Sequence, residues 1–294
     1  MPDFVVSGMT GFVGSHISEA LRKAGYTVSS YGEFRDGTER AGTFVHCANI
    51  HDSPTDNATF TADVLSTIAP RVERFVQIQT FATLHGLGAL DTARMNIGKT
   101  PLLMGPYGFG KLLQEQVTCR EAARYPGLAV RLFYLPVVLG GGSWGRVLEQ
   151  ARLHGVVLPP MISAKARANY IHVGDIAEHL IETRTDTAPG VRRAVLNRSD
   201  SATLTWPEFF RDAASVAIDN SPKAIIKRAV ICGGLAGYNI VSRLKTPTIP
   251  PGVPDRRPPR PVVAKTAAPI LAEPFRFSGL IQEVVCQQPY IAAR

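Results

Sequence analysis

Short apolar runs alternate with amphipathic stretches through the first half of the chain. The apolar runs predict strands at residues 4–7, 27–31, 43–47, 74–79 and 128–133. The stretches between them have helical periodicity and predict helices at 13–24, 57–69 and 108–124. A later unit at 169–183 has the pattern of a strand that leads into a helix. Because strands that alternate with helices form parallel sheets, the sequence predicts an α/β fold.

Three glycines follow the first predicted strand at three-residue spacing. In the segment FVVSGMTGFVGSHI they are Gly8, Gly11 and Gly14, and a helical pattern begins directly after them. Gly8 permits a tight turn, Gly11 lets backbone N–H groups approach a diphosphate, and Gly14 lets the helix pack closely on the sheet. The first helical N–H groups, including those of Phe12 and Val13, add donors and partial positive charge. The motif predicts a dinucleotide-binding turn in a Rossmann-type, doubly wound parallel sheet.

The end of the second predicted strand bears on the choice between NAD and NADP. An acidic side chain there binds the adenosine ribose, whereas an arginine accepts a 2′-phosphate. The stretch YTVSSYGEFRDG has Gly32 at the expected acidic position, Glu33 just after it and Arg35 close by. Arg35 favours NADP. The alternative is that Glu33 binds the ribose of NAD and that Arg35 is solvated.

A tyrosine and a lysine lie four residues apart in GPYGFGKLLQEQ. A helix places Tyr107 and Lys111 on one face. A nearby ammonium stabilises a phenolate and lowers the pKa of the phenol, which is ordinarily about 10. Tyr107 could then exchange a proton with a substrate hydroxyl or carbonyl, while Lys111 holds the cofactor ribose. Downstream of a dinucleotide-binding turn, this pair predicts nicotinamide-dependent hydride chemistry.

Taken together, these motifs resemble the extended short-chain dehydrogenase/reductases, and more narrowly the NAD-dependent epimerase/dehydratase group, which acts largely on nucleotide sugars. The resemblance runs from residue 4 to about residue 197 and includes VHCAN at 45–49, FVQIQTFATLHG at 75–86, PYGFGK at 106–111 and YIHVGDIAEHL at 170–180. It implies that Cys47, Ala48 and the segment 134–136, with Leu135 at its centre, contact the cofactor. It also implies a structural role for Asp175 and a homodimer formed through the helices at 57–69 and 108–124.

The chain departs from that family at the third catalytic group, a Ser or Thr hydroxyl five residues before the glycine of a VYG-like triplet. Phe81 occupies this position, and Thr80 and Thr83 flank it. We select Thr80 because it ends the apolar strand, where catalytic side chains of parallel sheets project. The alternative is that no hydroxyl assists and that activity is weak or altered.

Two further departures bear on the type of reaction. No Asp-Glu pair follows the position of the hydroxyl, which disfavours a sugar 4,6-dehydratase. The connection from Gly32 to the strand at 43–47 is too short for the usual strand and helix. Such shortening is more expected in a reductase that releases its cofactor in each cycle than in an epimerase that retains it.

Composition narrows the remaining classes. The 294 residues are 45% hydrophobic and 19% charged, which is typical of a globular chain of one large or two modest domains. The 32 basic and 24 acidic residues give a net charge of +8. No clustered basic-aromatic array accompanies this excess, so we expect it to serve phosphorylated ligands and not nucleic acid.

The cellular setting is also constrained. The four cysteines are separated and form no CxxC pair, which argues against a zinc site and fits a reducing compartment. The N-terminus lacks the pattern of a secretory signal, and the apolar segment 229–241 is too short to span a bilayer, so we interpret it as a buried or interface helix. We therefore expect a cytoplasmic protein without a bound metal or a membrane span.

The predicted organisation follows from these patterns. Residues 1–140 are expected to form the dinucleotide-binding domain, with 166–190 returning to it. Residues 141–165 and 191–294 are expected to form a smaller, C-terminal substrate-binding region. The latter includes a proline-rich connector at 247–261, in which Arg256, Arg257 and Arg260 could instead form a docking strip.

The function expected is an NAD(P)-dependent oxidoreductase or epimerase acting on a nucleotide-linked or otherwise activated sugar. Two alternatives stay open. One is a carbonyl reductase of a small hydrophobic ketone, which an apolar pocket near Trp144 and residues 158–161 would favour. The other is a dinucleotide-binding scaffold protein that has lost turnover, because fold alone does not fix function.

Overall fold

A parallel sheet forms the centre of the computed structural model, which describes residues 1–50, 53–80, 83, 106–154, 168–197, 204–215, 221–224, 226, 230, 262–263 and 282–285. Six parallel strands lie in the order β2-β1-β3-β4-β5-β8. They are β1 (Phe4–Ser7), β2 (Val28–Ser30), β3 (Ala41–His46), β4 (Val72–Thr80), β5 (Ala129–Leu135) and β8 (Gly190–Val195). Two antiparallel strands, β10 (Gln282–Val285) and β9 (Val262–Val263), extend the sheet beyond β8.

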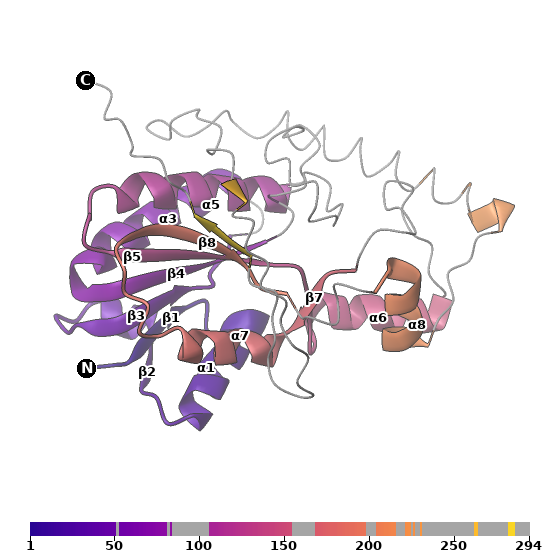
Figure 1. The fold of residues 1–294 in the computed structure, drawn as a ribbon, viewed down its shortest axis with the longest axis horizontal. Helices are drawn as coiled ribbons and strands as arrows, with labels where there is room; N and C mark the ends of the chain where they lie inside the picture. Colours follow the sequence, from indigo (N-terminus) through magenta and orange to yellow (C-terminus); the bar gives the residue numbers. More distant parts are fainter. Residues whose placement is uncertain are drawn as a thin grey trace, which may run out of the picture.

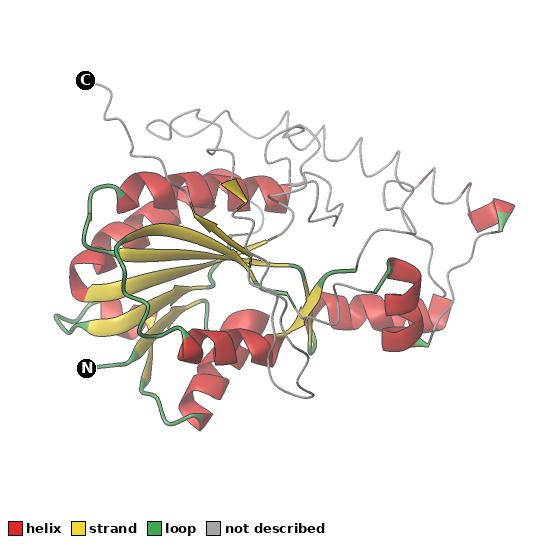
Figure 2. Cartoon of the chain, viewed as in Figure 1, coloured by secondary structure: helices red, strands yellow, loops and turns green. Residues whose placement is uncertain are grey.

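Helices cover both faces of this sheet (Figures 1 and 2). α3 (Pro54–Ile68) and α5 (Pro106–Ala122) pack together on one face, and α1 (Phe12–Lys23) and α7 (Val173–Glu182) pack together on the other. Alternate strand residues enter two separate cores, so that Phe44 and Phe75 face α3 while Val45 and Val76 face α1 and α7. The predicted α/β, Rossmann-type, doubly wound architecture is confirmed.

The elements that the hydrophobic pattern predicts for the sheet and its helices are present, with ends that differ by at most three residues. The second strand ends one residue earlier than predicted. Its last residue, Ser30, becomes the N-cap of α2 (Tyr31–Arg35), and this moves Tyr31 from strand to helix. The predicted strand-to-helix unit at 169–183 corresponds to β7 (Tyr170–His172) followed directly by α7.

The connection between β2 and β3 is as short as the sequence indicates. It contains α2 alone, so β2 is the edge strand of the parallel sheet within the described residues. Arg71, in the 3-10 turn η1 (Ala69–Arg71), donates to the carbonyl oxygens of Phe34, Gly37 and Arg35 and lies 4.4 Å from the centre of the Phe34 ring. These bonds hold the C-terminal end of α2 against the sheet domain.

A second group of elements lies beyond the carboxyl ends of the strands (Figure 1). β6 (Val137–Leu139) pairs with β7 in a two-stranded parallel sheet, and α6 (Gly142–His154) packs on α8 (Trp206–Ala214). The Trp144 ring stacks on Trp206 with centroids 6.0 Å apart, and Phe209 packs edge-on against both rings. The division into two domains stays a prediction, and β8 runs across its boundary at residues 190 and 191.

Two segments singled out in the sequence, the apolar stretch 229–241 (apart from residue 230) and the proline-rich stretch 247–261, lie outside the described residues. Among the helices that are described, none combines the length and the apolar character needed to cross a bilayer.

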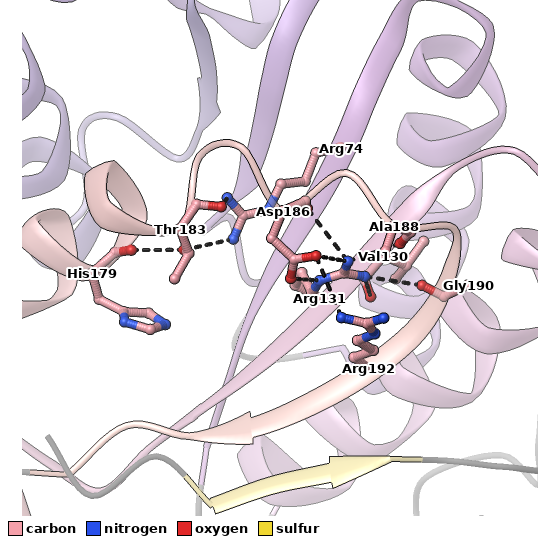
Figure 3. Close-up of polar contacts among 9 residues, drawn as sticks. All are labelled: Arg74, Val130, Arg131, His179, Thr183, Asp186, Ala188, Gly190 and Arg192. Carbon is pink, nitrogen blue, oxygen red and sulfur yellow. Dashed lines mark hydrogen bonds and ion pairs between the residues drawn. The ribbon is translucent and has the colours of Figure 1, made fainter. Parts of the chain in front are cut away.

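Buried arginines of two neighbouring strands anchor the turn between α7 and β8, as Figure 3 shows. Arg131 of β5 makes a two-pronged ion pair with Asp186, with both N···O distances at 2.7 Å, and also donates to the Ala188 carbonyl. Arg74 of β4, which is fully buried, donates to the carbonyl and hydroxyl oxygens of Thr183. Part of the positive charge of the chain is therefore structural.

Candidate active site

The predicted dinucleotide-binding turn lies between β1 and α1, and its geometry requires glycine. Gly8 has φ +71°, and a Cβ there would lie 2.8 Å from the backbone nitrogen of Ala48. A Cβ on Gly14 would collide with the carbonyl oxygen of Gly8, and one on Gly11 would lie 3.3 Å from the same atom. The turn is thus folded tightly against the start of α1, whose first N–H groups have no partner within the helix. This cradle fits the diphosphate of a dinucleotide.

The carboxyl end of β3 supports this turn. The Cys47 amide donates to the Ser7 carbonyl and the Ala48 amide to the Ser7 hydroxyl, each at 3.3 Å. Cys47 and Ala48 therefore lie beside Gly8, and their contact with a cofactor stays a prediction. Burial raises the pKa of the Cys47 thiol to about 12, although the Lys111 ammonium acts in the opposite direction. Cys47 is consequently a neutral packing residue at neutral pH.

Beside the end of β2, Glu33 and Arg35 have different surroundings. The Glu33 carboxylate accepts a hydrogen bond from the Ser30 amide at 2.8 Å and completes a capping box of α2. Arg35 pairs with Asp36 at 2.8 Å, and both side chains are more than half exposed. The carboxylate that could bind a ribose is thus engaged by the backbone, whereas the guanidinium lies at the surface.

Tyr107 and Lys111 occupy the first two turns of α5. Tyr107 is 43% exposed, and partial burial raises the pKa of its phenol while a hydrogen bond with Thr80 lowers it. Lys111 is buried, and its ammonium donates to the Ile78 carbonyl at 3.1 Å. Burial lowers the pKa of Lys111 to about 8. At neutral pH the lysine therefore keeps its charge beside the Ile78 carbonyl.

Of the two candidate hydroxyls, Thr80 meets the tyrosine. Thr80 ends β4, and its side chain hydrogen-bonds with Tyr107. The Thr83 hydroxyl donates to the Thr80 carbonyl at 2.7 Å and is buried. Phe81 and His85 lie outside the described residues. The structure thus brings Thr80 and Tyr107 together across 27 residues of chain.

Leu135 ends β5 and pairs in register with Thr80, so it lies beside the tyrosine–threonine pair. Its neighbour Tyr134 points to the opposite face of the sheet, where its hydroxyl lies 3.2 Å from Nε of Arg193. Of the two, only Leu135 has its side chain on the face of Thr80. Asp175 accepts a hydrogen bond from the His172 amide in a capping box of α7, which matches the structural role implied for it.

A buried polar network beneath the site was not predicted. The His46 imidazole lies 2.8 Å from the Ser7 hydroxyl and 3.1 Å from that of Thr61, while Gln114 of α5 donates to Thr61 and to Asn57. Burial, reinforced by the nearby Lys111 ammonium, lowers the pKa of His46 to about 3, so the ring is neutral. The sequence carries a signal that could have indicated this network: polar residues stand inside apolar runs, as His46 does in TFVHC.

Comparison with known proteins supports the architecture. No family model matches the sequence, and no curated protein matches it. Solved structures do match. MoeE5, whose structure contains UDP-glucose and NAD, is 18% identical, with a TM-score of 0.54 over 82% of this chain and 99% of that one. A nucleoside-diphosphate-sugar epimerase from Pseudomonas aeruginosa is 15% identical, with a TM-score of 0.55 over 80% and 86%.

Vestitone reductase from alfalfa is 17% identical, with a TM-score of 0.51 over 81% of this chain and 100% of that one. At these identities the likeness shows the fold. The chain therefore has the Rossmann-type α/β fold found in nicotinamide-dependent epimerases and reductases, and its glycine turn and its Tyr107–Lys111 pair lie at the same end of the sheet.

Proposed function

We propose that this chain is an NAD(P)-dependent oxidoreductase or epimerase of the extended short-chain dehydrogenase/reductase type, in the epimerase/dehydratase group, and that it acts on a nucleotide-linked sugar. The observation that carries the proposal is the hydrogen bond between Tyr107 and Thr80, at the end of the strand whose Ile78 carbonyl accepts from the buried ammonium of Lys111. The glycine turn at the end of β1 supplies the cofactor cradle.

The residues of the proposed site have different roles in the reaction. Tyr107 exchanges a proton with the substrate oxygen, and the Thr80 hydroxyl stabilises the phenolate that results by donating to it. The hydrogen bond with Thr80 counters the rise in the tyrosine pKa that burial causes, and Lys111 has the role of electrostatic partner and ribose ligand. A bound nicotinamide dinucleotide supplies or accepts the hydride. Gly8, Gly11 and the N–H groups of Phe12, Val13 and Gly14 would hold its diphosphate, with Cys47, Ala48 and Leu135 beside it.

The cofactor proposed is NADP in preference to NAD. Two observations support this choice. The Glu33 carboxylate already accepts a hydrogen bond from the Ser30 amide. The exposed Arg35 could bind a 2′-phosphate in place of its surface partner Asp36. The homodimer through α3 and α5 and the cytoplasmic location remain part of the same proposal.

The test begins with binding of NADPH and NADH, followed by turnover with a panel of sugar nucleotides, read from the absorbance of the reduced nicotinamide. Tyr107→Phe should bind the cofactor as the wild type does and should lower turnover at least about 100-fold. Tyr125→Phe is the matched control, because that tyrosine lies away from the site and its hydroxyl contacts only a backbone carbonyl among the described residues. Undiminished turnover in Tyr107→Phe would refute the assignment.

A carbonyl reductase of a small hydrophobic ketone is the second candidate. The aromatic cluster of Trp144, Trp206 and Phe209 favours it, because this cluster makes the core beyond the ends of the strands strongly apolar. Residues 158–161 lie outside the described residues. Turnover of hydrophobic ketones, with none of sugar nucleotides, would select this candidate, and cofactor binding without any turnover would select the scaffold.

A further inference from the structure

A second glycine turn lies against the first residue of α1. Gly140 and Gly141 connect β6 to α6, and Gly142 is the first residue of α6; their φ angles are +107°, +133° and +61°. A Cβ on Gly142 would lie 2.6 Å from Cδ1 of Phe12, and one on Gly141 would lie 3.2 Å from Cε2 of the same ring. The Phe12 ring thus fills the space that side chains on this turn would need.

The turn also lies close to the start of α7. A Cβ on Gly140 would lie 2.9 Å from Nε2 of His172 and 2.9 Å from Cγ1 of Val173. The Phe12 ring, for its part, packs edge-on against His16 at 4.8 Å, and His16 Nδ1 lies 2.7 Å from the Phe12 carbonyl oxygen. The Phe12 ring therefore contacts both the glycine turn and the helix to which it belongs.

We propose that Phe12 is a positioning residue that couples the location of α6 to the cofactor-binding turn. Its backbone follows Gly11 directly and belongs to the first turn of α1, while its side chain contacts the turn that opens α6. A displacement of the β6–α6 turn is therefore transmitted through the ring to the N–H groups that would face a diphosphate. This inference rests on the proposed binding of a dinucleotide.

The coupling has a functional consequence. α6 carries Trp144, which belongs to the aromatic cluster with Trp206 and Phe209 in the proposed substrate region. A ligand that fixes the turn at Gly11 also favours one position of α6. Binding of the cofactor would thereby fix the position of Trp144 in the proposed substrate region. Both tryptophans of the chain, Trp144 and Trp206, lie in this cluster, and tryptophan emission, excited selectively over tyrosine, therefore reports on it.

A double-mutant cycle tests the proposal with NADPH as the probe, or with NADH if the wild type binds that form more tightly. Gly142→Ala should weaken binding at least about 10-fold, because the new methyl group displaces the Phe12 ring. Phe12→Ala removes the ring, so that Gly142→Ala in that background should weaken binding less than about 3-fold further. Equal effects of Gly142→Ala in both backgrounds, or no effect in either, would overturn the proposal.

Two glycine variants separate this contact from other causes. Gly145→Ala lies on the same helix, where a Cβ has open space, and should bind as the wild type does. Gly190→Ala has φ +95° with open space around the Cβ, and it measures the effect of backbone strain alone. Thermal unfolding of every variant establishes that each is folded.

A spectroscopic measurement provides a readout that general destabilisation does not move. Saturating the wild type with the oxidised cofactor should change tryptophan emission, and the change in Phe12→Ala at saturation should be less than half as large. If the change in tryptophan emission were as large in Phe12→Ala as in the wild type, the coupling would be contradicted, even if the binding affinities agreed with the double-mutant cycle. If the wild type binds neither cofactor form, the proposed function fails and the coupling fails with it; if it binds and the cycle is additive, only the coupling fails.

Discussion

Gln79 donates from its side-chain amide to the backbone carbonyl of Lys111 across 3.3 Å. The lysine returns a hydrogen bond from its ammonium to the carbonyl of Ile78, the preceding residue of β4. The next residue of the strand, Thr80, contacts Tyr107. Three consecutive residues of β4 thus hold the two turns of α5 that carry the proposed catalytic pair, and this arrangement fixes the pair before any ligand binds.

The buried ammonium of Lys111 should leave a signature in the pH dependence of stability. The folded chain releases this proton near pH 8, whereas an unfolded lysine keeps it to about 10.5, so the unfolded state binds more protons in between. Relative to Lys111→Met, the wild-type free energy of unfolding should therefore rise by about 3 kcal/mol from pH 8 to 10.5. Urea titrations measure it. Lys23→Met is the control, because Lys23 is exposed. If the free energy of unfolding of Lys111→Met followed the same pH dependence as that of the wild type, the prediction would be contradicted.

His46 should make the protein sensitive to acid. Its pKa falls from 6.5 to about 3 on folding because the ring is buried, so the unfolded state takes up a proton first as the pH falls. Above pH 6.5 the neutral His46 ring makes its full contribution to the free energy of unfolding. By pH 5 the protein should have lost about 2 kcal/mol of this free energy. The variant His46→Asn should lose correspondingly less over this range. His179, whose pKa burial lowers to about 4, accounts for a further part of the wild-type loss.

The ion pair between Glu115 and Arg193 should show strong coupling in stability. The two side chains are 2% and 4% exposed and lie 2.9 Å apart between α5 and β8. Removing one partner leaves an uncompensated buried charge, so Glu115→Leu or Arg193→Met alone should cost about 3–5 kcal/mol. The double variant should cost less than either single variant. Thermal or urea unfolding supplies the four values, and additive losses would show that the charges act independently.

Cofactor preference should respond to the surface pair at the end of α2. Asp36→Asn frees Arg35 and should strengthen NADPH binding about 3-fold, whereas Arg35→Ala should weaken it about 10-fold, which corresponds to about 1.4 kcal/mol. Binding of NADH should change little in either variant, because that cofactor lacks the 2′-phosphate. Titration calorimetry with both cofactors distinguishes these outcomes. Equal losses for NADH and NADPH in Arg35→Ala would assign Arg35 a structural role instead.

Local patterns were sufficient for much of the architecture. The alternation of apolar runs and helical periods located the strands and helices of the sheet domain, because those periods express which face of each element is buried. The spacing of Gly8, Gly11 and Gly14 likewise identified the turn, since close backbone approach is a local requirement. Element ends shifted where a side chain bonded to the backbone, as at Ser30 and Glu33.

Contacts between distant parts of the chain decided the remainder. From the sequence, Thr80 and Thr83 were both available to Tyr107, and only the folded chain directs the Thr83 hydroxyl to a carbonyl and the Thr80 side chain to the tyrosine. The packing of Phe12 on Gly142 joins residues 130 positions apart. The sequence by itself determined the fold class, the glycine turn and the candidate pair, because these depend on neighbours along the chain. The tertiary structure decided which polar groups meet and which glycines are sterically required, because burial and hydrogen bonding are set by side chains brought together only on folding.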